Sequence, residues 1–202
     1  MKLSRKLALS AFAIIFGLST VAMVAFEAMS WDIDKTHSGV NFEIRHFFSP
    51  VNGAFEEYEA DIKFDPANLD ESSIDATVQV ASVNTKNERR DGHLQSADFF
   101  NAPEYPTMTF VSEKIEKTGH NQFVAHGTLT IKDTSTDFDL PFTLLGVQDH
   151  PMRENTKVAG ITSNFQLLRN DYGVGTGDWV SDAVVGNEVD VTLNLELHSS
   201  QK

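Results

Sequence analysis

The sequence predicts an all-β fold, an eight-stranded antiparallel β-barrel with a short helical excursion after the third or fourth strand. After residue 30, most segments alternate polar and apolar residues with a period of two, which is typical of strands with one buried face. No segment there has the length and period of a long helix. Strands that are apolar on one side only can stack as a sandwich or close as a barrel. Short turns between successive strands favour an up-and-down order, and closure removes exposed edges, so we expect a barrel.

Residues 1–30 are predicted to be a secretory signal peptide outside the fold. Lys2, Arg5 and Lys6 precede a nearly continuous apolar run, and Ala28-Met29-Ser30 offers small residues at a cleavage site before Trp31. Thr20-Val21-Ala22 is a second candidate cleavage site. An uncleaved membrane anchor is the alternative, because the run is just long enough to span a bilayer. We expect export and a single domain over residues 31–202, with no integral membrane span after signal removal.

The composition excludes several kinds of chemistry. The formal net charge is −13, and such an acidic surface repels nucleic acid and anionic lipid headgroups. The chain has no cysteine, which excludes a cysteine nucleophile, a thiolate metal site and a disulfide framework. We expect no nucleic-acid partner, and a fold that is held together by burial alone.

Each of the eight predicted strands has one apolar face. Five of the eight segments lie in the first two thirds of the chain. The sixth ends shortly before a break at Asp149-His150-Pro151, and the last two follow that break. The inward-facing residues are Val40, Phe42, Ile44; Tyr58, Ala60, Ile62, Phe64; Ile74, Ala76, Val78, Val80; Met108, Phe110, Ser112; Phe123, Ala125, Gly127, Leu129, Ile131; Phe138, Leu140, Phe142, Leu144; Ala159, Ile161, Ser163, Phe165, Leu167; and Val189, Val191, Leu193, Leu195, Leu197.

The segment from Asn84 to Phe110 interrupts this alternation. It begins with a charged run, residues 86–93, and then turns apolar at Phe99-Phe100. Ser96 is predicted to be the N-cap of a single helical turn, since its hydroxyl can accept from a free backbone N–H. Prolines at 103 and 106 end any helix. We expect an excursion across one end of the barrel, charged towards water and aromatic towards the interior; a solvated linker is the alternative.

A search for catalytic and metal-binding motifs finds no strong signal. The seven histidines lack metal-ligand spacing, and the Gly173–Gly177 loop lacks the lysine and the helix of a phosphate loop. Arg89, Asp91 and His93 could in principle do acid–base work, but a structural network that fixes the excursion is the favoured interpretation. We therefore predict no metal, no cofactor and no catalytic residue.

The interior is the remaining candidate site. The chain has 15 phenylalanines against two tryptophans and three tyrosines, and small residues such as Ala76 and Gly127 lie among the large ones on the inner faces. Such a barrel either packs solid or encloses an apolar cavity. The predicted ligand-binding residues are Phe42, Ile44, Ile62, Phe64, Ala76, Val78, Val80, Phe99, Phe100, Phe110, Leu129, Ile131, Phe142, Leu144, Ile161, Phe165, Leu193 and Leu195.

A series of motifs between Trp31 and the C-terminus resembles the YceI-like family, also called polyisoprenoid-binding or lipid-binding lipocalin-like domains. The motifs are Trp31-Asp32-Ile33-Asp34 with His37-Ser38, Val40-x-Phe42-x-Ile44, Val51-x-Gly53-x-Phe55, Ser82-Val83-x-Thr85, Tyr105-Pro106-x-Met108-x-Phe110, Gly127-x-Leu129-Thr130-Ile131 and Arg169-x-Asp171-Tyr172-Gly173, with Arg89–Phe100 the most specific. Two departures are Lys132-Asp133, where the family usually has glycine, and Tyr172, where phenylalanine is common.

The resemblance implies an eight-stranded antiparallel barrel whose long pore takes an amphiphilic isoprenoid lipid, such as a polyprenyl quinone, in a protein that is commonly periplasmic. It carries over no catalytic group. Three functions stay open: a periplasmic carrier or store for an isoprenoid lipid, an enzyme acting on such a lipid at the barrel mouth, and a solid, stress-linked interaction module. The oligomeric state is open as well, with a homodimer among the options.

Overall fold

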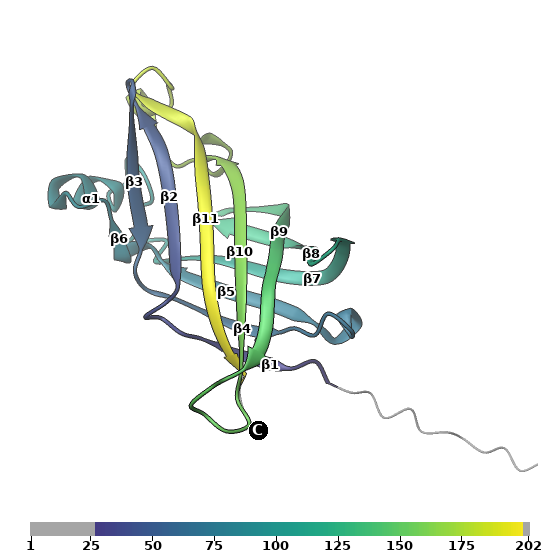
Figure 1. The fold of residues 1–202 in the computed structure, drawn as a ribbon. Helices are drawn as coiled ribbons and strands as arrows, with labels where there is room; N and C mark the ends of the chain where they lie inside the picture. Colours follow the sequence, from purple (N-terminus) through teal and green to yellow (C-terminus); the bar gives the residue numbers. More distant parts are fainter. Residues whose placement is uncertain (1–26, 200–202) are drawn as a thin grey trace, which may run out of the picture.

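The computed structural model describes residues 27–199, in which one antiparallel sheet closes into a barrel (Figure 1). In these residues the sheet has 11 strands: β1 (Ser30–Ile33), β2 (Gly39–His46), β3 (Ser49–Phe55), β4 (Tyr58–Lys63), β5 (Ser73–Gln79), β6 (Val83–Asn84), β7 (Thr107–Gly119), β8 (Gln122–Ile131), β9 (Thr134–Asp149), β10 (Lys157–Leu168) and β11 (Val185–Ser199). The ring runs β1-β4-β5-β7-β8-β9-β10-β11 and returns to β1. The predicted eight-stranded antiparallel barrel is therefore confirmed.

Strand β11 has two partners on the same edge, which explains the three strands outside the ring. Its C-terminal end pairs with β1, for example Leu197 with Ile33, and its N-terminal part pairs with β2 from Val185 to Asn194. The β2–β3 hairpin and β6 continue the sheet from there and extend past the ring at one end (Figure 1). The sequence does not predict strand β3 because its apolar alternation is weak, with Gly53 between Val51 and Phe55. The Phe42 ring occupies the space that a Cβ at Gly53 would need.

The excursion contains a helix, but the helix begins earlier than the sequence indicates. Helix α1 spans Glu88–Leu94, and the Asn87 side chain accepts from the Arg90 backbone N–H at 3.1 Å. The prediction that Ser96 caps a helical turn is wrong: Ser96 follows the helix, and its hydroxyl donates to the His93 carbonyl at 2.7 Å. Asparagine and serine cap equally well, and Asn87 has the extended backbone that an N-cap needs.

Short 3₁₀ turns connect several strands. They are η1 (Leu69–Glu71), η2 (Val80–Ser82), η3 (Arg169–Tyr172) and η4 (Gly177–Trp179). Among residues 27–199, no helix is long and apolar enough to cross a membrane.

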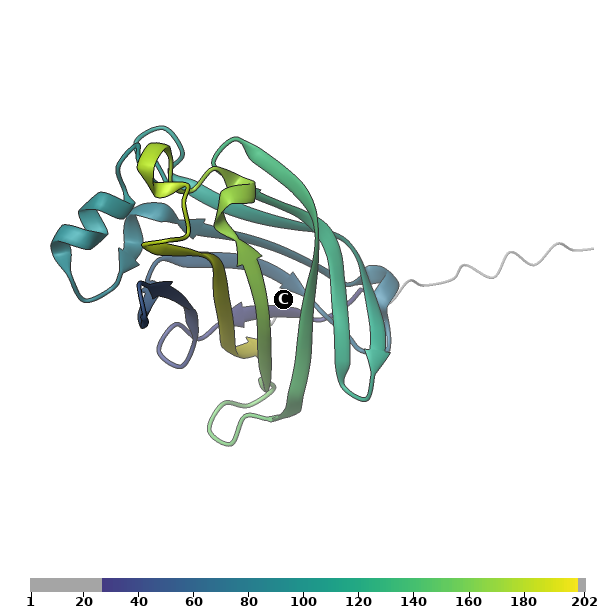
Figure 2. The same cartoon turned by 90° about the horizontal axis from the view of Figure 1, so that it is seen from above.

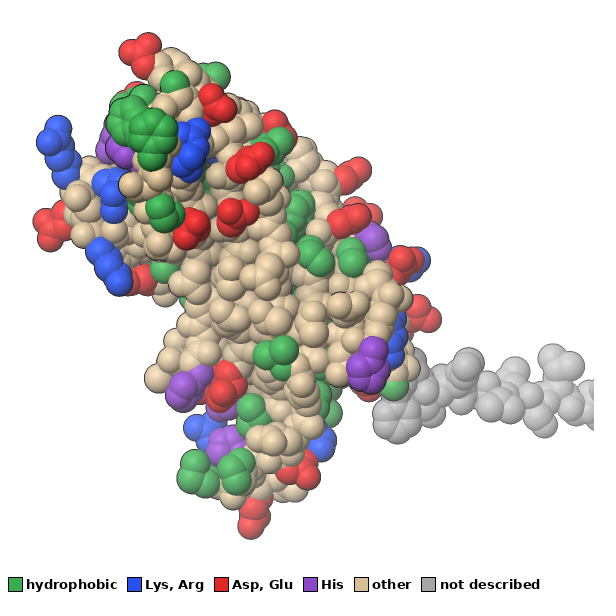
Figure 3. Space-filling view, turned by 45° about the horizontal axis from the view of Figure 1, so that its top comes forward, with side chains coloured by type: hydrophobic (Ala, Val, Ile, Leu, Met, Phe, Trp, Pro, Cys, Tyr) green, Lys and Arg blue, Asp and Glu red, His purple; other side chains and the backbone are tan. Residues whose placement is uncertain are grey.

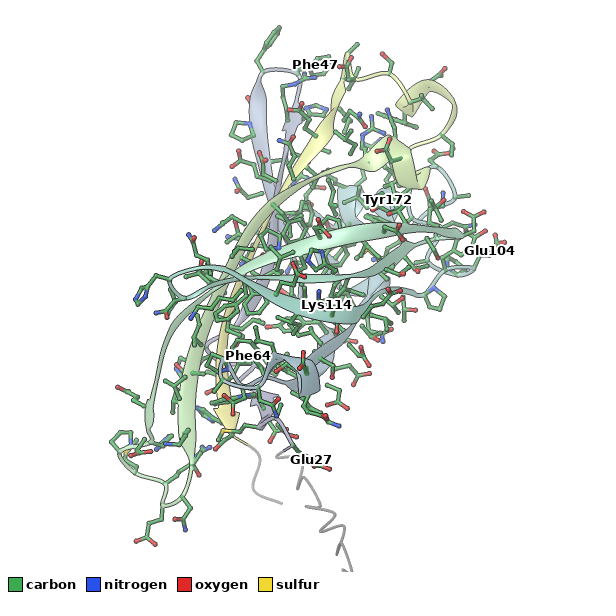
Figure 4. All side chains as sticks on the ribbon, turned by 90° about the vertical axis from the view of Figure 1, so that its right-hand side faces the viewer. Glu27, Phe47, Phe64, Glu104, Lys114 and Tyr172 are labelled. Atoms are coloured by element: carbon green, nitrogen blue, oxygen red, sulfur yellow. The ribbon has the colours of Figure 1, made fainter. Side chains whose placement is uncertain are left out.

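One end of the barrel is packed solid. Phe64, Phe123 and Phe142 contact one another with ring centroids 5.1–5.4 Å apart, and the Trp31 indole donates to the Phe64 carbonyl at 2.9 Å. Figure 4 labels Phe64 at this end. The buried members of this cluster are Trp31, Ile62, Phe64, Phe110, Ile115, Phe123, Ala125, Phe142, Leu144, Ala159, Ile161 and Leu197.

The other end is covered by the excursion and by the loop that follows β10. Phe99 is buried there with Tyr172 and Val174, and Phe100 and Trp179 pack against them. The backbone N–H of Thr176 donates to the Asp98 carbonyl at 2.8 Å, so the two coverings are joined. Figure 2, from above, shows α1 and the η3–η4 region at this end. The excursion thus turns its aromatic side inward, as the sequence predicts, and is not a solvated linker.

Candidate functional site

A cavity of about 770 Å³ lies inside the barrel, between the solid end and the covered end. Its size is within the usual range for small-molecule sites, and its wall is mostly apolar. Fifteen of the predicted ligand-binding residues lie on this wall. Thirteen of them were placed inward by alternation, which therefore identified the inner face correctly, and Phe99 and Phe100 come from the excursion. The fifteen residues are Phe42, Ile44, Ile62, Ala76, Val78, Phe99, Phe100, Phe110, Leu129, Ile131, Phe142, Ile161, Phe165, Leu193 and Leu195.

Three predicted residues do not reach the cavity. Phe64 and Leu144 point into the solid end, where they are 2% and 6% exposed. Val80 is 1% exposed but lies in η2, because β5 ends at Gln79 and the chain turns away from the wall. An alternating pattern shows which side of a strand faces inward. It does not show where along the strand the interior is filled by protein.

The wall also includes residues that alternation in the sequence did not identify as ligand-binding. Phe55 and Val51 come from β3, and the Phe55 ring lies 5.6 Å from Phe42 and 5.9 Å from Phe100, centroid to centroid. The signal that could have identified them is the motif Val51-x-Gly53-x-Phe55, which places both on one face of a strand. Phe138 and Leu140 of β9, which alternation placed inward but which were not among the predicted ligand-binding residues, also line the cavity.

The charged side chains that line the cavity are mainly arginines. They are Arg45, Arg89, Arg90 and Arg169, against one carboxylate, Glu59. Among the described residues, Arg89 is exposed and has no hydrogen bond or ion pair of its own. The lining of this mostly apolar cavity therefore includes an exposed cation.

The remaining charges of the excursion hold it in place. Arg90 donates from Nε to the Thr85 hydroxyl and from Nη2 to the Thr85 carbonyl, both at 2.7 Å. Asp91 Oδ1 accepts from the Thr85 backbone N–H at 2.9 Å and also from its hydroxyl. His93 pairs with Asp98 at 3.0 Å and contacts the rings of Phe99 and Trp179. Asp91 and His93 are thus engaged in fixing the segment, which matches the structural interpretation for these two residues but not for Arg89.

The loop over the covered end is organised by one buried arginine. Arg169 is 4% exposed and donates to the carbonyls of Gly186, Val174, Trp179 and Val185 at 2.7–2.9 Å and to Asn170 Oδ1 at 3.0 Å. Burial lowers the pKa of its guanidinium from the usual value. Because every N–H direction finds an acceptor, the charge is tolerated without a buried carboxylate beside it.

The two departures from the family motifs have structural explanations. The Tyr172 hydroxyl hydrogen-bonds the Thr136 hydroxyl at 2.8 Å, so the extra oxygen is satisfied. Lys132 adopts a φ of +56° in the turn where the family usually has glycine, and its ammonium donates to the Gly173 carbonyl at 2.6 Å. That bond ties the β8–β9 turn to the loop after β10.

A second polar cluster lies near the solid end, where the β1–β2 connection meets β11. His37 Nδ1 lies 2.9 Å from Asp34 Oδ2, and His198 Nε2 lies 3.2 Å from Glu196 Oε1. The ligand atoms of Asp34, Glu196 and His198 lie within 4.8 Å of one another, which is close enough to hold a metal ion. Each carboxylate has a histidine partner, Asp34 with His37 and Glu196 with His198, and Ser38 adds bonds to the Glu196 backbone. Sequence spacing could not show this cluster, because its members come from opposite ends of the chain.

The fold and the cavity define a lipocalin-like β-barrel protein with an apolar interior. A sequence profile described as "YceI-like domain" matches residues 31–197, and the chain belongs to the YceI family. A UPF0312 protein of Staphylococcus aureus (strain USA300) is 33% identical over 177 residues, which cover 85% of this chain and 99% of that protein.

Solved structures agree with this assignment. Burkholderia cenocepacia BcnA superposes with a TM-score of 0.73 at 30% identity, over 82% of this chain and 99% of that one. A polyisoprenoid binding domain from Saccharophagus degradans gives a TM-score of 0.63 at 15% identity, over 85% and 99%, and so shares the fold.

Proposed function

We propose that the protein binds the apolar chain of an isoprenoid lipid inside the barrel and carries or stores it in the periplasm. The observation that supports this most strongly is the apolar cavity between the two packed ends. A polar solute in it would leave hydrogen-bonding groups unpaired, which is costly in an apolar environment. The related fold of the Saccharophagus degradans polyisoprenoid binding domain points to the same class of ligand.

The shape of the cavity favours a long chain over a compact molecule. On β11 alone, the lining residues extend from Val185 to Leu195. Ten residues of strand span roughly 30 Å, so the lined length suits an extended hydrocarbon. Arg89 at the mouth can meet a polar headgroup while the chain occupies the interior. The arrangement therefore suits an amphiphile, whose polar headgroup would contact Arg89 and whose apolar chain would contact the cavity wall.

The test is extraction of the purified protein with organic solvent, followed by mass spectrometry of the extract. We expect an isoprenoid lipid in an amount comparable to the protein, and its loss and recovery on delipidation and reloading. An extract without lipid, from protein purified without detergent, would contradict the proposal. Incubating the extracted species with the protein then tests for turnover, and an unchanged lipid is the expected result.

A further inference from the structure

The turn between β2 and β3 presents two phenylalanines to solvent. Phe48 is 98% exposed and Phe47 is 48% exposed, and they form the two-residue connection between the paired residues His46 and Ser49. Phe47 has a φ of +49°, in the left-handed region that asparagine and glycine favour in such turns. Phe47 therefore does not suit the turn, and neither ring is part of a core. A role outside the fold explains both rings better than a structural one.

The hairpin tip is held firmly at the end of the molecule where the cavity has its charged residues. Arg45 donates to the Phe47 carbonyl at 2.6 Å and to the Asp182 carbonyl at 2.5 Å, and the Phe47 N–H donates to the Val184 carbonyl at 2.7 Å. Figures 1 and 4 show the hairpin tip projecting beyond the eight-stranded barrel, with Phe47 labelled in Figure 4. Arg45 and His46 also line the cavity, so the projecting rings and the cavity share one wall.

The surroundings of the tip match the interfacial zone of a bilayer. Val180, 52% exposed, lies on the loop that Arg45 fastens to the hairpin, and Arg45 itself is exposed beside the rings. Figure 3 shows an apolar patch at this end with basic side chains next to it. Aromatic rings beside arginine are typical of surfaces that enter lipid headgroups. Asp178 and Asp182 are exposed on the same loop, so the rings, and not a net positive charge, must provide the attraction.

We propose that Phe47 and Phe48 insert into the surface of a phospholipid bilayer and hold the cavity mouth against it. The inference rests on the proposed function for its purpose, because a carrier of an apolar chain must collect and deliver that chain at a membrane. A protein partner fits less well. Stable protein interfaces bury about 800 Å² on each partner, and two rings on a narrow hairpin cannot supply such an area. The same argument disfavours a homodimer formed through this tip.

The test is flotation with vesicles of phosphatidylethanolamine and phosphatidylglycerol at low and high salt. We expect the wild-type protein to float at both salt concentrations. The vesicle partition coefficient of the double variant Phe47→Ser/Phe48→Ser should be at least about tenfold lower. Met152 is the matched control, because it is 85% exposed on the β9–β10 loop at the opposite end (Figure 1). Met152→Ser should float as the wild type does. Equal loss in both variants, or no flotation of the wild type, would overturn the proposal.

Further measurements distinguish membrane insertion from self-association, and test lipid binding in the cavity separately from docking. In Phe48→Trp, the indole emission should shift to the blue on vesicle addition and be quenched by brominated lipid, whereas Met152→Trp should do neither. A concentration-dependent dimer that the double serine variant abolishes would instead assign the tip to a second copy. Mass spectrometry of the same preparations reports the bound lipid. Lipid-loaded protein that does not float contradicts the docking alone, and floating protein that never holds lipid contradicts the proposed function alone.

Discussion

Gly175 leaves open the space that the Arg169 guanidinium fills. A Cβ on Gly175 would overlap Arg169 Nη1, and the backbone there has a φ of +97°, which other residues rarely adopt. Since Arg169 joins the η3–η4 loop to β11 through backbone carbonyls, a change at Gly175 should loosen the cover of the cavity.

We therefore expect Gly175→Ala to lower the free energy of unfolding by about 2–5 kcal/mol, from backbone strain together with overpacking. Urea unfolding measures this. Gly177→Ala is the matched control, because Gly177 has a φ of +55° but no atom within 4 Å of its would-be Cβ. It should cost only the strain, about 1–2 kcal/mol. Equal losses in the two variants would show that the contact with Arg169 has no energetic weight.

The Asp34–His37 pair should make stability depend on pH on both sides of neutrality. Its hydrogen bond lowers the pKa of Asp34 from 3.8 to about 2 and raises the pKa of His37 above 6.5. A carboxyl with a lowered pKa in the folded state stabilises fully above pH 3.8 and loses that contribution as the pH falls towards 2. A histidine with a raised pKa stabilises below pH 6.5 and loses its contribution as the pH rises through the higher, folded value.

Unfolding experiments between pH 2 and pH 9 check this. Asp34→Asn should remove the acid-side slope and also reduce the slope above pH 6.5, and His37→Gln should do the reverse, because one hydrogen bond is the largest cause of both pKa shifts. Glu196 also raises the pKa of His37, so Glu196→Gln should reduce the slope above pH 6.5 without removing it. A profile that neither Asp34→Asn nor His37→Gln alters would show that the pair is not formed in solution.

Trp179 is predicted to slow the exit of a bound lipid. Its ring lies on the cavity wall, 5.1 Å from His93 and 5.5 Å from Phe99, and is only partly buried. Trp179→Ala should speed lipid release, measured by transfer to acceptor vesicles, more than it lowers the melting temperature. Phe99→Ala should change both strongly, because Phe99 is 5% exposed and belongs to the buried cluster. Unchanged release from Trp179→Ala would mean that the loop is only a connection between strands.

The contacts of the first described residues bear on export. The Phe64 N–H donates to the Met29 carbonyl at 2.8 Å, Ser30 begins β1, and Ala28 is 6% exposed. Cleavage before Trp31 would remove these contacts, whereas cleavage after Ala22 would keep them. Of the predicted signal peptide, residues 1–30, the first 26 residues lie outside the described part of the chain. We predict that N-terminal sequencing of the periplasmic fraction finds a start upstream of Ala28. Met1 on a membrane-bound form would overturn the export proposal.

How far the sequence predicts this structure depends on the kind of signal. Alternation placed Ala76 and Leu193 on the inner wall because a strand has only two sides. It could not show that Phe64 lies in the packed end whereas Phe42 lines the cavity. That difference depends on contacts with strands that are distant in sequence. Arg169 belongs to a family motif, but its role in the loop could not be inferred from the residues, because most of its acceptors are backbone carbonyls. The choice between Asn87 and Ser96 as N-cap was local, but both residues are equally good caps.

Ala76→Phe decides whether the cavity is space that a ligand fills. Ala76 lies on the cavity wall, opposite Ala60 on β4 and Phe110 on β7. In a solid core an added ring costs about 1–3 kcal/mol in overpacking. In the cavity the ring can occupy space that a lipid would take, and it buries apolar area worth about 25 cal/mol per Å². We therefore expect delipidated Ala76→Phe to be about as stable as delipidated wild type, and to bind lipid poorly.

Two controls make the result specific. Ala125 is 0% exposed in the solid cluster, so Ala125→Phe should show the full cost of overpacking. Thr77 is the neighbour of Ala76 on β5 and is not on the cavity wall, so Thr77→Phe should leave lipid binding unchanged. All stabilities must be compared without lipid, because loss of a ligand lowers apparent stability by mass action alone. If Ala76→Phe destabilises the delipidated protein as much as Ala125→Phe does, the interior at Ala76 is packed by protein, and a long chain has no room to bind there.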